Sequence, residues 1–183
     1  MNPAPNLFPI GPMGAGKSTL GKRVADALGL PFFDLAPALP PPCSAAIALI
    51  FDIEGEAGFR RRESATLAEF AARDGIVLAT GGGAILADEN RDLLRERGFV
   101  VFLETTVDEQ LERLARDRKR PLLAAPDRRE RLQQLAAQRD PVYRQIADLT
   151  VPAGHRGSVA QVAQQLAAQL AHAWQRHATG CAA

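Results

Sequence analysis

The feature that most constrains this chain is a glycine-rich loop placed between a short apolar run and an amphipathic segment. Residues 7–10 read Leu-Phe-Pro-Ile, residues 11–18 read Gly-Pro-Met-Gly-Ala-Gly-Lys-Ser, and residues 17–30 carry apolar side chains at helical spacing. A strand, a turn and a helix in this order bring backbone N–H groups and the positive end of the helix onto one anion. We therefore predict an α/β fold in which residues 11–18 bind phosphate, and we call them the phosphate loop.

The residue types inside the phosphate loop fit a nucleoside triphosphate with its Mg²⁺ ion. Gly14, Ala15 and Gly16 present backbone N–H groups to phosphate oxygens. Lys17 is placed to reach the β- and γ-phosphates, and Ser18 to ligate Mg²⁺. The alternative is a glycine-rich turn that matches by accident. We favour the phosphate site, because the apolar run before the loop and the periodic helix after it are the context that the motif requires.

The rest of the chain alternates between apolar runs and segments of helical period. This alternation predicts a parallel sheet covered by helices on both faces, with ligands beyond the carboxyl ends of the strands. Pro9 counts against a central first strand, and Pro141 allows a break in a long helix, since each lacks an N–H donor. The predicted strands are 7–10, 31–34, 75–79, 99–103 and 147–151, and the predicted helices are 17–30, 58–72, 88–97, 106–116, 128–146 and 158–177.

Charge and composition exclude several classes of partner. The 22 basic residues nearly balance the 21 acidic ones, so no overall field attracts nucleic acid or an anionic membrane. No stretch approaches the roughly 20 apolar residues of a membrane span. Cys43 and Cys181 lack metal-ligand spacing, which indicates two unpaired thiols in a reducing cytoplasm. We expect one domain over residues 1–183 that acts on small molecules as a monomer.

Three arginines and a triple glycine lack an obvious structural role. Arg60, Arg120 and Arg139 lie near the ends of predicted elements, where guanidinium groups can meet carboxylate or phosphate oxygens. Solvated surface charges are the alternative, and composition does not choose between the two. The run Gly81–Gly83 is either a flexible strand exit or a place where backbone approaches a ligand.

Several motifs taken together resemble the shikimate kinase family over about residues 7 to 152. The combination of Phe-Arg-x-x-Glu, a triple glycine and Arg-Pro-Leu-Leu is specific to that family, whereas the phosphate loop alone is generic. The resemblance implies a three-layer α/β fold like that of the nucleoside monophosphate kinases, with a five-stranded parallel sheet in the order 2-3-1-4-5. It also implies transfer of the γ-phosphoryl group of ATP, with Mg²⁺, to the 3-hydroxyl of shikimate. The motifs are Gly11–Thr19, Phe51–Glu63, Gly81–Gly83, Arg120–Leu123 and Arg139–Arg144.

The resemblance assigns acceptor-site roles to matching residues. Arg60 and Arg139 would clamp the shikimate carboxylate. The three glycines would approach its ring and hydroxyls, and two aromatic side chains would wall the pocket. These glycines and aromatics are Gly81, Gly82, Gly83, Phe51 and Phe59.

Further roles concern the nucleotide and the transfer step. Thr19 would join the phosphate loop in binding ATP, and Arg113 and Arg156 would lie beside adenine. Asp34 would share the Mg²⁺ site with Ser18. Arg120 would close over the phosphoryl group on a lid at about residues 115–127. The catalytic residues would be Lys17, Arg120 and Asp34.

The chain departs from the family pattern after Asp34. The resemblance implies a second aspartate two residues later, which binds a shikimate hydroxyl, but position 36 is Ala36. Residues 36–46 also contain three consecutive prolines, which oppose the charged helix that the family has there. Two explanations stay open: a short segment read in a shifted frame, and genuine divergence that weakens use of the acceptor.

Two other functions therefore stand beside that of a shikimate kinase. One is a kinase for another small hydroxylated acid such as gluconate. The other is a nucleotide-binding module with impaired catalysis. Loss of a positioned acid–base carboxylate typically removes ~10²–10⁴ in rate, so the sequence predicts slow rather than absent turnover.

Overall fold

The computed structural model of the chain contains a single parallel sheet of five strands. The strands are β1 (Asn6–Ile10), β2 (Phe32–Asp34), β3 (Val77–Ala79), β4 (Gly98–Glu104) and β5 (Leu149–Pro152). Their order is β2-β3-β1-β4-β5, which confirms the predicted arrangement and the α/β fold class. The structure describes residues 4–38, 44–115, 127–152 and 159–174, and at residue 37 and residues 44–52 it describes the backbone only.

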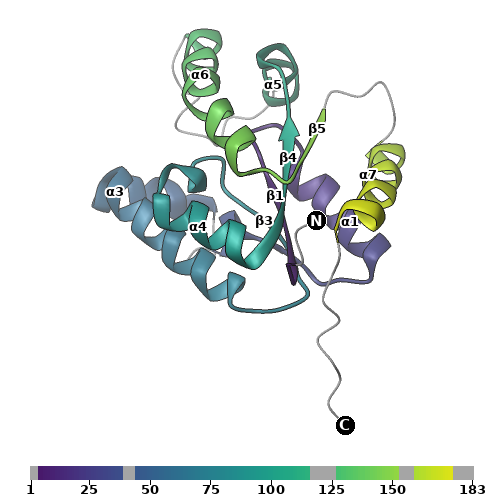
Figure 1. Ribbon diagram of the computed structural model, residues 1–183. Helices are drawn as coiled ribbons and strands as arrows, with labels where there is room; N and C mark the ends of the chain where they lie inside the picture. Colours follow the sequence, from purple (N-terminus) through teal and green to yellow (C-terminus); the bar gives the residue numbers. More distant parts are fainter. Residues whose placement is uncertain (1–3, 39–43, 116–126, 153–158, 175–183) are drawn as a thin grey trace.

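Helices cover both faces of the sheet, as Figure 1 shows. On one face, α1 (Lys17–Leu28) packs against α7 (Val159–Ala173). The other face carries α3 (Ser44–Ala71), α4 (Asp88–Arg97) and α6 (Arg128–Ile146), and α5 (Val107–Leu114) stands with α6 beyond the end of β4. Two short elements, α2 (Leu35–Ala38) and the 3₁₀ turn η1 (Ala84–Leu86), follow β2 and β3. In the described part of the chain, no helix is long and apolar enough to cross a membrane.

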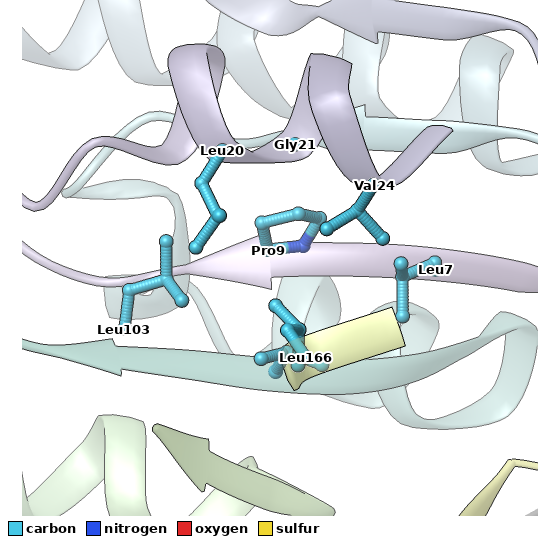
Figure 2. Close-up of a pocket in the computed structure, with 8 residues that line it drawn as sticks. Leu7, Pro9, Leu20, Gly21, Val24, Leu103 and Leu166 are labelled. Carbon is cyan, nitrogen blue, oxygen red and sulfur yellow. The ribbon is translucent and has the colours of Figure 1, made fainter. Parts of the chain in front are cut away.

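Successive residues of the strands contribute to two cores, one on each side of the sheet. In β4, Val101 and Leu103 enter the core under α1 and α7, whereas Val100 and Phe102 enter the core under α3, α4 and α6. This alternation follows from the two-residue period of a strand. Figure 2 shows a small apolar hollow in the first of these cores, beside the ring of Pro9.

The central strand β1 pairs fully with β4 and only briefly with β3. Five register pairs join β1 to β4, but a single pair, Leu7↔Val77, joins β1 to β3. The N–H of Leu7 donates to the carbonyl of Ile76 on the β3 side, at 2.9 Å. The missing N–H of Pro9, two residues later, falls on the same side. The predicted strand is therefore confirmed as the central one although it contains Pro9, and a shortened ladder with β3 accompanies the proline.

α3 is longer than the helix predicted there, whereas α6 has the predicted bounds. α3 begins at Ser44 rather than Gly58, and it contains a kink at Gly55, whose φ of 67° leaves the helical region. Glycine adopts this φ without strain because it has no Cβ. α6 runs through Pro141 without a break. The proline removes one intrahelical hydrogen bond, but the fully buried Tyr143 that follows it keeps this part of α6 against the sheet.

The segment after β2 is more helical than predicted. α2 occupies Leu35–Ala38 and α3 begins at Ser44, while residues 39–43, which include the three consecutive prolines, lie outside the described residues. The prediction that prolines oppose a helix across residues 36–46 is therefore wrong for 36–38 and for 44–46. Pro37 is tolerated because it lies in the first turn of a helix, where its missing N–H has no intrahelical partner to lose.

The start of α5 follows the predicted threonine cap. The N–H of Glu109 donates to Thr106 Oγ1 at 3.3 Å, and the N–H of Thr106 donates to the Glu109 carboxylate at 2.8 Å. This reciprocal pair is a capping box, which satisfies two N–H groups that the helix leaves without partners. It fixes the direction of α5 as it leaves the sheet beside the phosphate loop.

Candidate active site

The phosphate loop joins β1 to α1 and has the backbone geometry of an anion site. Gly11, Gly14 and Gly16 have φ values of 140°, 79° and 88°, in the region that favours glycine. Lys17 lies across the loop, where its Nζ donates to the carbonyls of Gly11 and Pro12, each at 2.8 Å. The Lys17 ammonium group and the positive end of α1 therefore lie side by side at the loop, and this arrangement suits the binding of phosphate.

Ser18 and Asp34 bring two oxygen ligands together beside the phosphate loop. The Ser18 hydroxyl donates to one oxygen of the Asp34 carboxylate. The N–H of Ala36 donates to the other oxygen at 3.2 Å. Ser18 belongs to the first turn of α1 and Asp34 to the end of β2, so the parallel sheet places both at its carboxyl edge. Hydroxyl and carboxylate oxygens are ligands that Mg²⁺ accepts.

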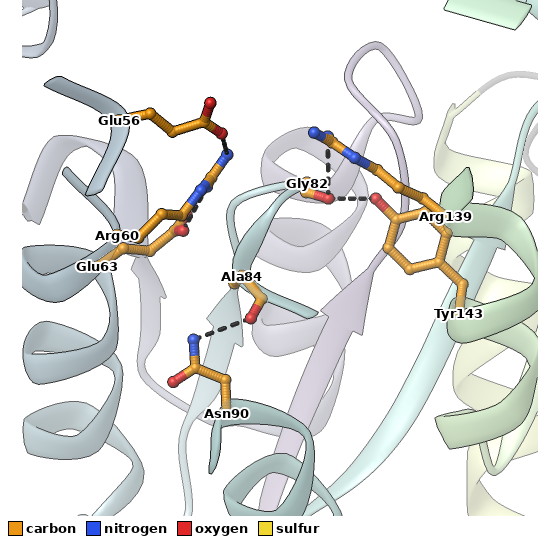
Figure 3. Close-up of polar contacts among 8 residues, drawn as sticks. All are labelled: Glu56, Arg60, Glu63, Gly82, Ala84, Asn90, Arg139 and Tyr143. Atoms are coloured by element: carbon orange, nitrogen blue, oxygen red, sulfur yellow. Dashed lines mark hydrogen bonds and ion pairs between the residues drawn. The ribbon is translucent and has the colours of Figure 1, made fainter. Parts of the chain in front are cut away.

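Arg60 and Glu63 form an ion pair against Gly81–Gly83, which we call the glycine loop (Figure 3). Arg60 Nη1 donates to the Glu63 carboxylate at 2.6 Å, and Arg60 Nη2 to Glu56 at 3.2 Å. Glu63 is 2% exposed, and burial raises the pKa of its carboxyl although Arg60 opposes the shift. The Arg60 guanidinium occupies the place that a side chain at Gly83 would need. The ion pair and the glycine loop thus hold Arg60 in one orientation.

Arg139 and Tyr143 approach the glycine loop from α6, one helical turn apart. The Tyr143 hydroxyl donates to the carbonyl of Gly82 at 2.5 Å, and Arg139 Nη1 donates to the same oxygen at 3.4 Å (Figure 3). The ring of Tyr143 stacks on Phe102 of β4, with ring centres 5.0 Å apart. Burial raises the pKa of the Tyr143 phenol, so the hydroxyl stays a donor at neutral pH.

The glycine loop lies next to the phosphate loop. A Cβ at Gly82 would lie 3.3 Å from the carbonyl oxygen of Gly11 and 3.6 Å from the nitrogen of Met13. Such an added methyl group would be at about contact distance from the phosphate loop, so the gap between the two loops at Gly82 is about the width of one methyl group. The arginine-lined region and the phosphate loop therefore form one continuous site.

Each of the two arginines keeps a nitrogen without a partner. Among the described residues, Nε of Arg60 and Nε of Arg139 are buried and make no hydrogen bond. A buried donor without an acceptor costs about 1–3 kcal/mol. In Figure 3 the two side chains reach toward the glycine loop from opposite sides. This geometry suits a small anion that brings acceptor oxygens to both guanidinium groups.

Of the remaining predicted site residues, some lie near the phosphate loop or Arg60, and others lie outside the described residues. Arg113 Nη1 donates to the carbonyl of Gly14 at 3.0 Å, so Arg113 lies against the phosphate loop. Phe59 is 9% exposed, and the Arg60 guanidinium lies 5.2 Å from the centre of its ring. Ala15 is buried, and Thr19 is exposed in the first turn of α1. Arg120, Arg156 and the side chain of Phe51 lie outside the described residues.

Comparison with known proteins identifies the family. The family model described as shikimate kinase matches residues 13–171. The chain belongs to the shikimate kinase family. Shikimate kinases of Stenotrophomonas maltophilia (strain R551-3) and Chromohalobacter salexigens are 49% and 52% identical to it, over 96% and 88% of this chain and 97% and 90% of theirs. Membership of this family makes the chain an ATP-dependent small-molecule kinase, as the resemblance implied.

Solved structures of shikimate kinases have the same fold. The shikimate kinase from Acinetobacter baumannii in complex with shikimate matches with a TM-score of 0.87 and 42% identity, over 93% of this chain and 95% of that chain. A gluconokinase from Sinorhizobium meliloti matches with a TM-score of 0.62 at 23% identity. The second match shows a shared fold alone, so it adds no support for gluconate as the acceptor.

Two side chains at this shikimate kinase site were absent from the predicted site residues. Both were present only within motifs, Glu63 in Phe51–Glu63 and Tyr143 in Arg139–Arg144, and neither was assigned a role. Each lies one helical turn after a predicted arginine, Glu63 three residues after Arg60 and Tyr143 four residues after Arg139. Side chains three or four apart on a helix are neighbours, so helical spacing around each arginine was the available indication.

Proposed function

We propose that this chain transfers the γ-phosphoryl group of ATP to the 3-hydroxyl of shikimate. The observation that carries the proposal is that the glycine loop lies within about one methyl group of the phosphate loop, which places an arginine-lined anion site beside a nucleotide site. Shikimate carries one carboxylate for the two guanidinium groups and several hydroxyls for the backbone of the glycine loop. The A. baumannii relative was solved in complex with shikimate, which supports the same acceptor here.

The acceptor would be oriented by its carboxylate. Arg60 and Arg139 would each donate to it through Nε and a terminal nitrogen, as guanidinium groups do in bidentate pairs. Glu63 and the carbonyl of Gly82 already hold the two side chains in place. Binding therefore orders few side chains, and this limits its entropic cost. Phe59, and with it Phe51, would form the apolar wall of the pocket.

The nucleotide would be bound by the phosphate loop. The backbone N–H groups of Gly14, Ala15 and Gly16, with Thr19, would surround the phosphates. Lys17 would leave the carbonyls that it now contacts for the β- and γ-phosphates.

The transfer step would depend on charge stabilisation around the γ-phosphoryl group. Phosphoryl transfer relies mainly on positioning and electrostatic stabilisation. We assign this charge stabilisation to Lys17 and to Arg120, on the lid predicted at residues 115–127. Arg113 and Arg156 would instead lie beside the adenine of ATP.

Ser18 and Asp34 are the residues that fit a Mg²⁺ ion. Their oxygens already lie within hydrogen-bond distance of each other. Mg²⁺ usually takes one or two carboxylate ligands and completes its shell with phosphate oxygens and water, so a small protein site suffices. The bound ion would neutralise charge on the β- and γ-phosphates. The described residues contain no cluster of three or more His, Cys, Asp or Glu side chains that offers a rival site.

Position 36 provides no carboxylate for the acceptor hydroxyl, because it is an alanine. Ala36 is exposed, and its N–H donates to the Asp34 carboxylate. A missing acid–base group leaves positioning and electrostatic stabilisation in operation. We propose slow turnover, about 10²–10⁴ below that of a protein with the carboxylate restored.

Steady-state ADP release tests the proposal. The purified protein with Mg²⁺ and ATP should release ADP when shikimate is added, and release should not rise with gluconate. Arg60→Ala should raise the KM for shikimate and leave the KM for ATP nearly unchanged, because Arg60 lies on the acceptor side of the glycine loop. Release that depends on gluconate, or that depends on no acceptor, would support one of the two alternative functions instead.

The oligomeric state, the localisation and the absence of macromolecular partners stay predictions. We expect a monomer in the cytoplasm that binds ATP and shikimate and neither nucleic acid nor membrane. Size-exclusion chromatography with light scattering tests the monomer, and a dimer at micromolar concentration would contradict it.

A further inference from the structure

The proposed reaction assigns no substrate contact to Tyr143, yet Tyr143 is among the largest fully buried side chains. Its ring lies on Phe102 with the two planes 21° apart. A buried tyrosine needs a partner for its hydroxyl. The partner here is the carbonyl of Gly82, at 2.5 Å. One rigid side chain thus connects the core of the sheet to the glycine loop.

Gly82 stands where the two substrate sites meet. A Cβ on this residue would lie 3.3 Å from the Gly11 carbonyl oxygen and 3.5 Å from the Tyr143 hydroxyl. The three glycines have no side chains, so the position of the glycine loop depends on the contacts that other groups make with its backbone. The carbonyl of Gly82 accepts from Tyr143 at 2.5 Å and from Arg139 at 3.4 Å. The tyrosine bond is the shorter of the two, and it belongs to the more rigid side chain.

We propose that Tyr143 is a positioning residue that fixes the glycine loop at the spacing from the phosphate loop that the acceptor requires. This inference rests on the proposed function. Tyr143 acts through Gly82: while its hydroxyl holds that carbonyl, Gly83 stays against Arg60 and the acceptor faces the phosphate loop. Without the hydroxyl, the carbonyl keeps only the long bond from Arg139.

Tyr143→Phe tests the role by removing one oxygen and keeping the ring. We expect the KM for shikimate to rise about tenfold, the effect of one lost hydrogen bond, while the KM for ATP stays within about twofold. Amide hydrogen exchange in a peptide that spans residues 80–86 should become faster without any substrate present. A general loss of stability would not raise the KM for shikimate while leaving the KM for ATP nearly unchanged.

Trp174→Phe is the matched control. It also removes a buried aromatic donor to a backbone carbonyl, since Trp174 Nε1 donates to Ala4 at 2.7 Å. The contact lies under α7, on the face of the sheet away from α6. This variant should lower the melting temperature and leave both the KM for shikimate and the exchange at residues 80–86 unchanged.

The outcomes separate this inference from the proposed function. A folded Tyr143→Phe protein with unchanged KM for shikimate and unchanged exchange overturns the inference. If that variant does not fold, Phe102→Leu keeps the hydroxyl but removes the stacked ring, and an unchanged KM for shikimate there overturns it equally. If the wild type shows no turnover that depends on shikimate, the proposed function fails, and hydrogen exchange alone then decides whether Tyr143 anchors the loop.

Discussion

Replacing Gly83 by alanine tests whether the Arg60 guanidinium is held against the glycine loop. The backbone at Gly83, with φ −104° and ψ −4°, accepts an alanine, so the added methyl group causes the effect. That methyl would lie 2.4 Å from both terminal nitrogens of Arg60, whereas ordinary contact begins at 3.4 Å, so the guanidinium must retreat by about 1.0 Å. The 2.6 Å bond from Arg60 to Glu63 would then stretch toward the limit of a hydrogen bond. Loss of such a charge-assisted bond amounts to about 1.5–3 kcal/mol.

The expected result is a rise of about 10- to 100-fold in the KM for shikimate, with the KM for ATP unchanged, in steady-state ADP release. A double-mutant cycle supplies the control. In an Arg60→Ala background the methyl at Gly83 meets no guanidinium, so Gly83→Ala should add little further loss there. An unchanged KM for shikimate in Gly83→Ala, or equal losses in the two backgrounds, would refute the steric reasoning.

Three further predictions concern the phosphate loop, a helix cap and a buried carboxyl. Lys17→Ala should reduce ADP release below detection, because the loop loses its cation; an unchanged kcat contradicts the phosphate assignment. Thr106→Ala should lower the free energy of unfolding by about 1 kcal/mol in urea, through loss of the capping box, and an unchanged value contradicts that role. Because burial raises the pKa of Glu63, the folded protein holds this proton more tightly than the unfolded chain, so the free energy of unfolding should fall as pH rises from the ordinary value of 4.5 through the raised pKa. Glu63→Gln should flatten that fall in urea titrations at several pH values, and an unchanged slope would contradict it.

Much of the fold follows from periodicity. The apolar runs predicted all five strands, and the order of the sheet came with the resemblance. The start of α3 was missed because residues 44–53 are almost uniformly apolar and follow a run of prolines, so no helical period marks them. The kink at Gly55 also requires packing for its explanation, since a glycine within a helix has no fixed conformation by itself.

At the site, the sequence predicted several of the residues that take part but not the contacts between them. Motif spacing singled out Arg60, Arg139 and the three glycines, and the structure brings them together. Motif spacing did not indicate that Gly82 lies beside the phosphate loop or that Tyr143 donates to the Gly82 carbonyl. Both arrangements bring together segments far apart in the chain, so they depend on how the elements pack in three dimensions rather than on any local pattern.

Identification of the product is the most direct test of the central claim. The wild-type protein and an Ala36→Asp variant would be incubated with Mg²⁺, ATP and shikimate, and the phosphorylated position would be assigned by NMR. We expect one phosphate ester at the 3-hydroxyl, formed slowly by the wild type and about 10²–10⁴ faster by Ala36→Asp. ATP binding without any phosphorylated shikimate from the wild type would contradict the claim and leave a nucleotide-binding module.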